Sequence, residues 1–195
     1  MPNWCRNHVA IQGNKDDVAK FMDTVTKWNE DEGVTYYDFT AVNPLPTEMQ
    51  ELHQGGRNID GVYVDAWYED EDGARPLLDI TKQELIDKYG VYAPIDWQYD
   101  YWGTKWGDLN TELQSDSTTK DIRKVRFWFE SAWGQPYMLL NDIATKFNLT
   151  IRNDYEVEGD YEEQTTTFPI PDYESLVKSQ RLASASMRDS IRNKS

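Results

Sequence analysis

Apolar and polar residues alternate along Lys124–Glu130, and an apolar stripe at helical spacing follows. Val125, Phe127 and Phe129 are the apolar set, which is typical of a strand with one face in a core. Gly134 then allows a turn, and Pro136 suits the first position of a helix. We expect Trp133 to pack at this corner. The helix has one apolar face, made by Leu139, Leu140, Ile143, Ala144 and Phe147.

The N-terminal pattern is of the same kind. Asn7–Gln12 alternates and predicts a first strand, which Gly13 ends. Asn14 is a suitable helix cap, and the acids at 16 and 17 favour the first turn. The following residues predict the clearest amphipathic helix of the chain: Val18, Phe21, Met22, Val25 and Trp28.

The remaining elements are predicted from weaker patterns. Val34–Val42 is rich in strand-forming residues and predicts the second strand. Thr81 and Glu84 form a capping box for a helix that Gly90 ends. We also expect a short helix at 47–53, an extended segment at 59–68, a hairpin of 108–114 with 121–130, and strands at 149–157 and 165–168.

With 43–120 set aside, the order is β-α-β followed by β-α-β. This order predicts an α+β fold of the ferredoxin-like split βαβ type, with an antiparallel sheet and two helices on one face. We therefore expect one domain over 1–170 with an aromatic-rich insertion at about 43–120. Residues 171–195 form a C-terminal helix or tail with few apolar positions, which is a candidate for docking between subunits.

Charge is strongly and unevenly negative. The net charge is −15, and the segments 60–72 and 154–163 each hold six carboxylates and no base. Such a body repels phosphate backbones, so we expect no direct binding of nucleic acid. The acid runs serve solubility alone, or they face a basic partner. The candidates for such a partner surface are Asp65, Glu69, Asp70, Glu71, Asp72, Asp154, Glu156 and Glu158.

Cysteine usage and hydropathy indicate a compartment. Cys5 is the single cysteine, so no disulfide forms within the chain, which fits a reducing cytosol. The first residues lack a signal pattern, and no stretch approaches the ~20 apolar residues of a membrane span. We expect a location in the cytoplasm of a bacterial host cell and no membrane partner.

Three separated motifs resemble one family. MPNWCRN opens the chain, WGTKW occupies 102–106, and FWFESAWGQP occupies 127–136. Together they resemble the YubB-like ferredoxin-fold domain of phage- and plasmid-encoded proteins. The corner Ser131–Pro136 departs from the Thr-Ala-Trp-Ser-Pro-Pro of that family at three positions. The resemblance covers about residues 1–161 and implies a fold and a mobile-element origin. It implies no reaction.

Known catalytic and cofactor patterns lack support. The chain has no Gly-rich phosphate loop of either common type. Cys5, His8 and His53 are too few for a structural zinc site. Cys5 and His8, three apart on a strand, point to opposite faces and do not suit a nucleophile and its base. We expect no catalytic residues, metal or cofactor.

Two groups of residues are candidates for ligand or partner binding. Trp102, Lys105 and Trp106 either form a surface that binds through stacking and cation–π contacts, or the two rings cover a small core of the insertion while Lys105 points outward. The open sheet face carries Arg126 and Trp128. Trp133, which we expect to plug the end of the core, is a further candidate. That face stacks bases in RNA-binding domains, but the acids here argue that the insertion or a second chain covers it.

The leading hypothesis is a non-enzymatic accessory protein of a phage or mobile element that binds, and inhibits, a host protein such as a defence or nucleic-acid enzyme. It rests on the acid runs and the resemblance. The alternative is a small-molecule-binding or enzymatic protein with a pocket between the sheet and the WGTKW segment. Self-assembly through the C-terminal helix is a third reading.

Overall fold

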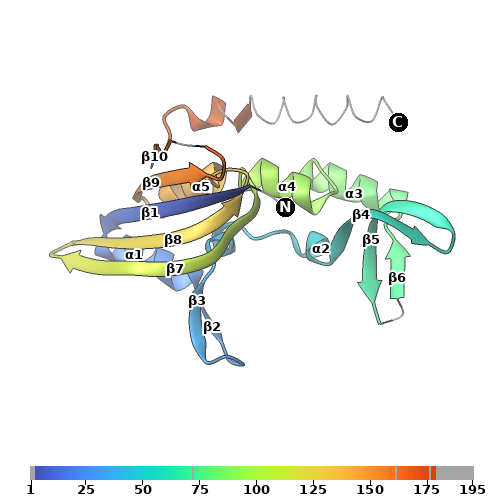
Figure 1. Cartoon of the computed structure of the whole chain (residues 1–195), viewed down its shortest axis with the longest axis horizontal. Helices are drawn as coiled ribbons and strands as arrows, with labels where there is room; N and C mark the ends of the chain where they lie inside the picture. Colours follow the sequence, from blue (N-terminus) through green and yellow to red (C-terminus); the bar gives the residue numbers. More distant parts are fainter. Residues whose placement is uncertain (1–2, 72, 161, 176, 179–195) are drawn as a thin grey trace.

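A five-stranded antiparallel sheet forms the main body of the computed structural model, which describes residues 3–71, 73–160, 162–175 and 177–178. The strand order is β10-β9-β1-β8-β7, so the N-terminal strand lies in the centre (Figure 1). Every neighbouring pair is antiparallel. The strands are β1 (Trp4–Asn14), β7 (Lys105–Thr119), β8 (Ile122–Ala132), β9 (Thr150–Val157) and β10 (Gln164–Phe168).

Alternation sets the two faces of this sheet. In β1, Val9 and Ile11 are buried, whereas His8 and Gln12 are exposed. Val9 pairs with Phe127 of β8, so apolar side chains of neighbouring strands meet on one face. The prediction of strands at both ends of the chain is confirmed.

Two helices cover the apolar face. They are α1 (Lys15–Val25) and α5 (Tyr137–Lys146), and Figure 1 shows them behind the sheet. Asn14 caps α1, since its side chain accepts a hydrogen bond from the backbone N–H of Asp16 at 2.9 Å. The prediction that α1 continues to Trp28 is wrong. The helix ends at Val25, and Trp28 lies on a hairpin strand with 61% of its surface exposed.

Val34–Val42 is not the second strand of the sheet, contrary to the prediction. Its first half is β3 (Val34–Tyr37), which pairs with β2 (Thr26–Asn29) in a separate hairpin that projects from the body (Figure 1). Its second half is the 3-10 helix η1 (Phe39–Val42). Phe39 is fully buried and makes edge-to-face contacts with Phe21, Phe127 and Phe129. Burial of this ring against the sheet overrides the strand propensity around it.

A second group of elements lies beyond η1, on the right of Figure 1. It contains a three-stranded sheet and three helices: α2 (Thr47–Gln50), β4 (Leu52–Ile59), β5 (Val62–Asp70), β6 (Gly73–Pro76), α3 (Asp79–Tyr89) and α4 (Pro94–Tyr101). The predicted capping box is wrong, because α3 begins at Asp79 and no side chain caps it. Gly90 ends α3 in the left-handed conformation, as predicted.

The core confirms the predicted packing. Phe127, Phe129, Ile143, Val9, Ile11, Phe21 and Val25 are buried in one cluster. The α+β prediction is therefore confirmed. β7 lies within the range 43–120 that we expected to be an insertion, yet it pairs along β8 in the main sheet. The segment that separates α1 from the next strand of this sheet is therefore 26–104.

Two further expectations concern the surface and the end of the chain. The open face of the sheet is not covered by the insertion, since His8, Arg126 and Arg152 on it are exposed. The C-terminal helix expected over 171–195 lies mostly outside the described residues. Among the helices within the described residues, none combines the length and apolar character needed to cross a bilayer.

Candidate functional site

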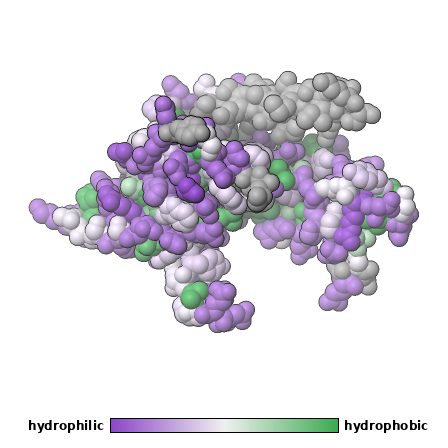
Figure 2. Space-filling view, in the orientation of Figure 1, coloured by the Kyte–Doolittle hydropathy of each residue, from purple (hydrophilic) through white to green (hydrophobic). Residues whose placement is uncertain are grey.

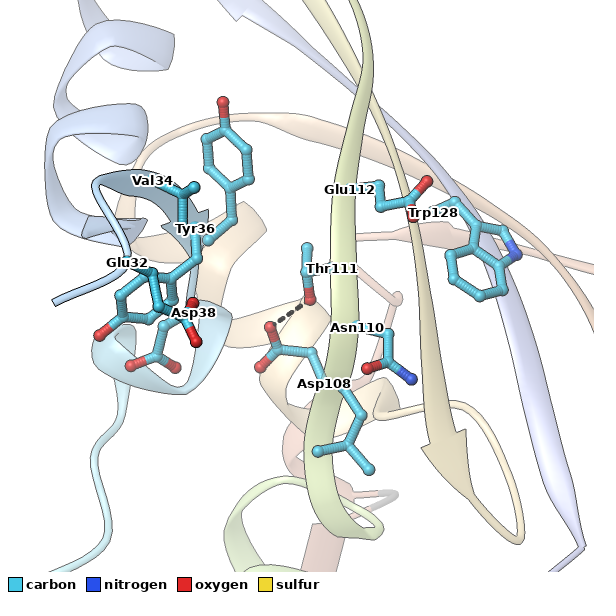
Figure 3. A pocket seen from close by; sticks show the side chains of 11 residues that line it. Glu32, Val34, Tyr36, Asp38, Asp108, Asn110, Thr111, Glu112 and Trp128 are labelled. Atoms are coloured by element: carbon cyan, nitrogen blue, oxygen red, sulfur yellow. Dashed lines mark hydrogen bonds between the residues drawn. The ribbon is translucent and has the colours of Figure 1, made fainter. Parts of the chain in front are cut away.

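A groove separates the projecting hairpin from the edge strand β7. Figure 3 looks into it, with β3 on one side and β7 on the other. Its volume is about 970 Å³, and it continues around β7 to Trp128 on the open face. We call it the acidic groove. Its lining consists of Glu32, Val34, Tyr36, Tyr37, Asp38, Asp108, Leu109, Asn110, Thr111, Glu112 and Trp128.

The hairpin turn positions the β3 wall of the groove. The side chain of Asn29 accepts hydrogen bonds from the backbone N–H groups of Asp31 and Glu32, at 3.0 and 3.2 Å. Gly33 adopts a positive φ of 65° and donates its N–H to the Asn29 carbonyl. The polar NEDEG run at 29–33 therefore forms a tight turn that places Glu32 and Val34 at the rim.

Asp108 forms the back of the groove and fixes η1. Its carboxylate accepts hydrogen bonds from the backbone N–H groups of Phe39 and Thr40, at 3.0 and 3.3 Å, and from the Thr111 hydroxyl at 2.7 Å (Figure 3). Part of the residue is exposed, but protein surrounds the carboxylate. Burial, with a smaller contribution from the nearby charge of Asp38, raises the pKa of Asp108 to about 6.

Negative charge dominates the groove. Four lining residues are carboxylic acids, and none of the described lining residues is basic. Asp38 accepts hydrogen bonds from Thr40 and Ala41 and so also caps η1. Glu32 and Glu112 stand at the rim and are exposed. A ligand with positive charge would offset the repulsion among these carboxylates.

Aromatic rings give the groove an apolar surface beside its acids. Tyr37 packs edge-to-face on Phe127 with ring centroids 5.2 Å apart, so its position is set by the core. Tyr36 is 46% exposed and Trp128 is half-buried. Rings near carboxylates are the combination that binds guanidinium and ammonium groups through cation–π contacts and ion pairs.

The WGTKW candidates are divided between two environments. Trp102 is buried, and its indole N–H donates to the Asn43 carbonyl at 2.8 Å. Trp106 instead lies near Trp4, with ring centroids 6.0 Å apart. The Lys105 ammonium lies over the Trp106 ring at 4.1 Å. The expectation that the two rings cover one small core is therefore wrong, because α4 ends at Tyr101 and β7 begins at Lys105.

Trp133 does not pack at the end of the core, contrary to the prediction. It is 51% exposed and has a φ of 71°. Its backbone N–H donates to the Asn3 carbonyl at 2.8 Å, and the left-handed backbone turns the ring outward. Ala132 and Met138 are buried at this end of the core instead.

The three motifs quoted for the family resemblance meet at one end of the sheet. Trp4 and Lys105 both pair with Ala132 of β8, on its two sides. Beneath them, the Asn7 amide donates to the Ser131 hydroxyl at 2.9 Å, and Asn153 donates to Asn7 at 2.9 Å. Residues from MPNWCRN, WGTKW and the Ser131–Pro136 corner are thus in contact, as one structural unit.

The acidic candidates do not form one surface. Asp65 pairs with Lys82 at 2.8 Å, and Glu69 pairs with Arg57 at 3.4 Å, both in the second group of elements. Asp154 and Glu156 lie on the open face and pair with Arg152 and Arg6. Glu158 accepts a hydrogen bond from the Trp4 N–H. Glu71 is exposed, and Asp72 lies outside the described residues together with the Asp70 side chain.

The polar residues near Cys5 are structural. The Cys5 thiol is buried beside Asn7, and burial raises its pKa to about 11. A thiol that stays protonated at neutral pH is a poor nucleophile. His8 is on the opposite face, as the strand spacing predicted. Within the described residues, no group of three or more His, Cys, Asp or Glu is arranged to hold a metal ion.

Sequence reasoning missed Asp38, Asp108 and Tyr36. Asp108 directly follows WGTKWG, and Asp38 precedes Phe39, but nothing local distinguishes these acids from the others in so acidic a chain. Only the packing of η1 against β7 brings them together. Comparisons of the chain with protein-family models, curated proteins and solved structures found no match.

Proposed function

We propose that this protein is a non-enzymatic accessory protein of a phage or related mobile element, and that it binds a host protein through the acidic groove. The observation that carries the proposal is the groove itself, in which four carboxylates and three aromatic rings line one hollow without a basic residue. Such a lining suits an Arg or Lys side chain on a basic protein surface. Inhibition of a defence or nucleic-acid enzyme fits, because a surface that binds nucleic acid is basic.

The projecting hairpin supports a protein rather than a small ion as the ligand. Trp28, Val34 and Tyr36 are exposed on it, at 61%, 46% and 46% of their surfaces. Exposed apolar side chains beside a polar hollow are typical of protein interfaces. A partner would therefore place a cationic side chain in the groove and apolar atoms against the hairpin.

The topology agrees with the fold that the family resemblance implies. Leaving β10 aside, the sheet order β9-β1-β8-β7 with α1 and α5 on one face has the pattern of a ferredoxin-like split βαβ fold. We infer that the chain has this fold, with the insertion between the first helix and the second strand. This fold is also that of the family which the three motifs resemble.

Capture from bacterial lysate tests the proposal. The groove variant Glu32→Gln/Glu112→Gln removes two rim charges without touching the caps of η1. The control Glu51→Gln/Glu84→Gln removes two exposed charges from the second group of elements. We expect the wild type and the control to capture one protein in stoichiometric amount. The groove variant should capture at least about tenfold less of that protein, since two charge contacts are removed.

Two results would contradict the proposal. Equal capture by all three proteins would exclude the groove, and equal loss in both variants would show that only net charge matters. Mass spectrometry of the purified protein tests the alternative of a small-molecule-binding or enzymatic protein with a pocket between the sheet and the WGTKW segment. A small compound that stays bound to the protein, without a protein partner, would favour it.

A further inference from the structure

The open face of the main sheet carries a row of residues that is small in the middle and basic on both sides. Ala10 of β1 pairs with Arg126 of β8 and with Arg152 of β9. Side chains directly opposite on one sheet face are neighbours, so both arginines flank the methyl group of Ala10. Two residues further along β1, on the same face, Gln12 pairs with Lys124 of β8.

A hollow of about 420 Å³ lies over this row. Its side-chain lining includes four basic residues, His8, Lys124, Arg126 and Arg152, with Gln114 and a single acid, Asp154. A volume of this size accommodates a ligand of nucleotide dimensions. The lining of this hollow is therefore positively charged, although the chain as a whole has a net charge of −15.

Of the Lys and Arg side chains that line the hollow, only Arg152 has an acidic partner within the described lining. Asp154 is already compensated, because it pairs with Arg152 at 2.8 Å and accepts a hydrogen bond from the Thr165 hydroxyl at 2.6 Å. Within the described part of the chain, the side chains of Arg126 and Lys124 make no hydrogen bond or ion pair; only the backbone carbonyl of Lys124 accepts a hydrogen bond, from the Ser117 hydroxyl. Both remain available to an anion.

An aromatic side chain stands beside the hollow. Trp128 follows Arg126 by two residues and shares its face, roughly 7 Å further along the strand. Across from it in the register lies His8. A planar base placed over these rings would stack, while its phosphate group reached the two arginines.

We propose that this hollow binds a nucleoside phosphate. Arg126, Arg152 and Lys124 contact the phosphate group above Ala10, and Trp128 and His8 contact the base. Acidic side chains limit the length of the ligand, since Glu130 and Glu156 lie in one neighbouring row and Glu112 lies beyond Trp128. A longer nucleic-acid strand would meet these acids, so a single nucleotide fits best. The proposal does not require a partner in the acidic groove, although Trp128 also lines that groove.

Tryptophan fluorescence and calorimetry test the site on the full chain. The probes are ATP, AMP, inorganic phosphate and a ten-residue single-stranded oligonucleotide. We expect ATP and AMP to bind at low salt and to change the fluorescence, and inorganic phosphate to bind at least about tenfold more weakly because it lacks the stacked base. Arg126→Ala should weaken AMP binding about tenfold or more. The control Lys20→Ala, on the opposite side of the sheet, should leave it unchanged.

The remaining results separate the parts of the proposal. Trp128→Ala should abolish the preference for AMP over inorganic phosphate while the chain keeps its circular dichroism spectrum. The site would be overturned if AMP did not bind at a concentration on the order of 10 mM. It would also be overturned if Lys20→Ala weakened AMP binding as much as Arg126→Ala does. Equal affinity for phosphate and AMP would overturn its nucleoside specificity, and an oligonucleotide bound about a hundredfold more tightly than AMP would identify a nucleic-acid surface instead.

Discussion

At the scale of single residues, Asp108 links the acidic groove to the core. Its carboxylate holds two N–H groups at the start of η1, and η1 carries the buried Phe39. The same burial that organises η1 disfavours the charged form of Asp108 and raises its pKa to about 6. Asp108 therefore contributes both to the shape of the groove and to its charge.

Asp108 predicts a specific pH dependence of stability. The folded state binds more protons at this site than the unfolded chain between 3.8, its ordinary pKa, and about 6. The contribution of Asp108 to the free energy of unfolding therefore rises as the pH falls from 7 to 5, by about 1 kcal/mol. Urea unfolding at both pH values should show that, from pH 7 to 5, the free energy of unfolding of the wild type rises by about 1 kcal/mol relative to that of Asp108→Asn.

Comparison of the two proteins isolates this effect. Asp65, Asp116 and Asp154 have pKa values lowered by Lys82, Arg123 and other partners, so they stabilise the fold above their ordinary pKa and lose that effect in more acidic solution. Because both proteins contain them, their effect cancels. A pH response in Asp108→Asn equal to that of the wild type would show that Asp108 does not titrate in this range.

Lys105 predicts a small effect. Its ammonium lies over the half-buried Trp106 ring, and such contacts at accessible sites contribute about 0.5–1 kcal/mol. Lys105→Ala should therefore lower the free energy of unfolding by less than about 1 kcal/mol, whereas Trp102→Ala should cost about 3–5 kcal/mol because Trp102 is buried. If Lys105→Ala abolished partner binding without loss of stability, this residue would belong to a binding surface.

At the scale of elements, strong apolar periodicity predicts correctly that a helix is present but does not predict where it ends. The apolar residues of α1 repeat so regularly that the helix was evident, but Trp28 continues the same spacing and does not belong to it. The N–H of Thr26 bonds the Met22 carbonyl, and the chain then extends as β2. Helical spacing of apolar residues indicates that one face of a segment is buried. It does not indicate that the helix ends at Val25 and that a hairpin begins before Trp28 is reached.

Substitution of Trp28 tests whether this ring lies outside the core, as the end of α1 at Val25 requires. Trp28 is 61% exposed on β2, so Trp28→Ser should change the free energy of unfolding by less than about 0.5 kcal/mol. Phe127→Ala is the control, since this ring is buried among Phe21, Tyr37 and Phe39 and its loss should cost about 3–5 kcal/mol. A Trp28→Ser effect of several kcal/mol would instead place the ring in the core.

The acidic groove could not be predicted for a related reason. Its walls come from 32–38 and 108–112, whereas we predicted a regular strand over 34–42 and a hairpin of 108–114 with 121–130. The predicted hairpin of β7 with β8 is confirmed. The hydrophobic pattern did not predict that β7 is a strand of the main sheet. Pairing along β8 is a contact between segments, which periodicity within a segment does not encode.

At the scale of the whole molecule, the C-terminal residues predict an effect of salt. Residues 174–195 hold five basic and two acidic side chains, in contrast to the acidic remainder. If they join copies of the chain, removal of 176–195 should lower the mass seen by light scattering. Raised salt should lower it too, because exposed charge pairs are screened. A monomeric full-length protein at micromolar concentration in low salt would rule out assembly of this kind.

The central position of β1 has a consequence for synthesis. This strand is synthesised before its partners β8 and β9, which begin at Ile122 and Thr150. At about 5–20 residues per second, translation of residues 15–121 takes roughly 5–20 s, during which both edges of β1 are without their partners. The apolar face of β1 is exposed for that period to chaperones and to other nascent chains. Yield in the cell should therefore respond to the rate of translation more strongly than the stability of the finished fold would suggest.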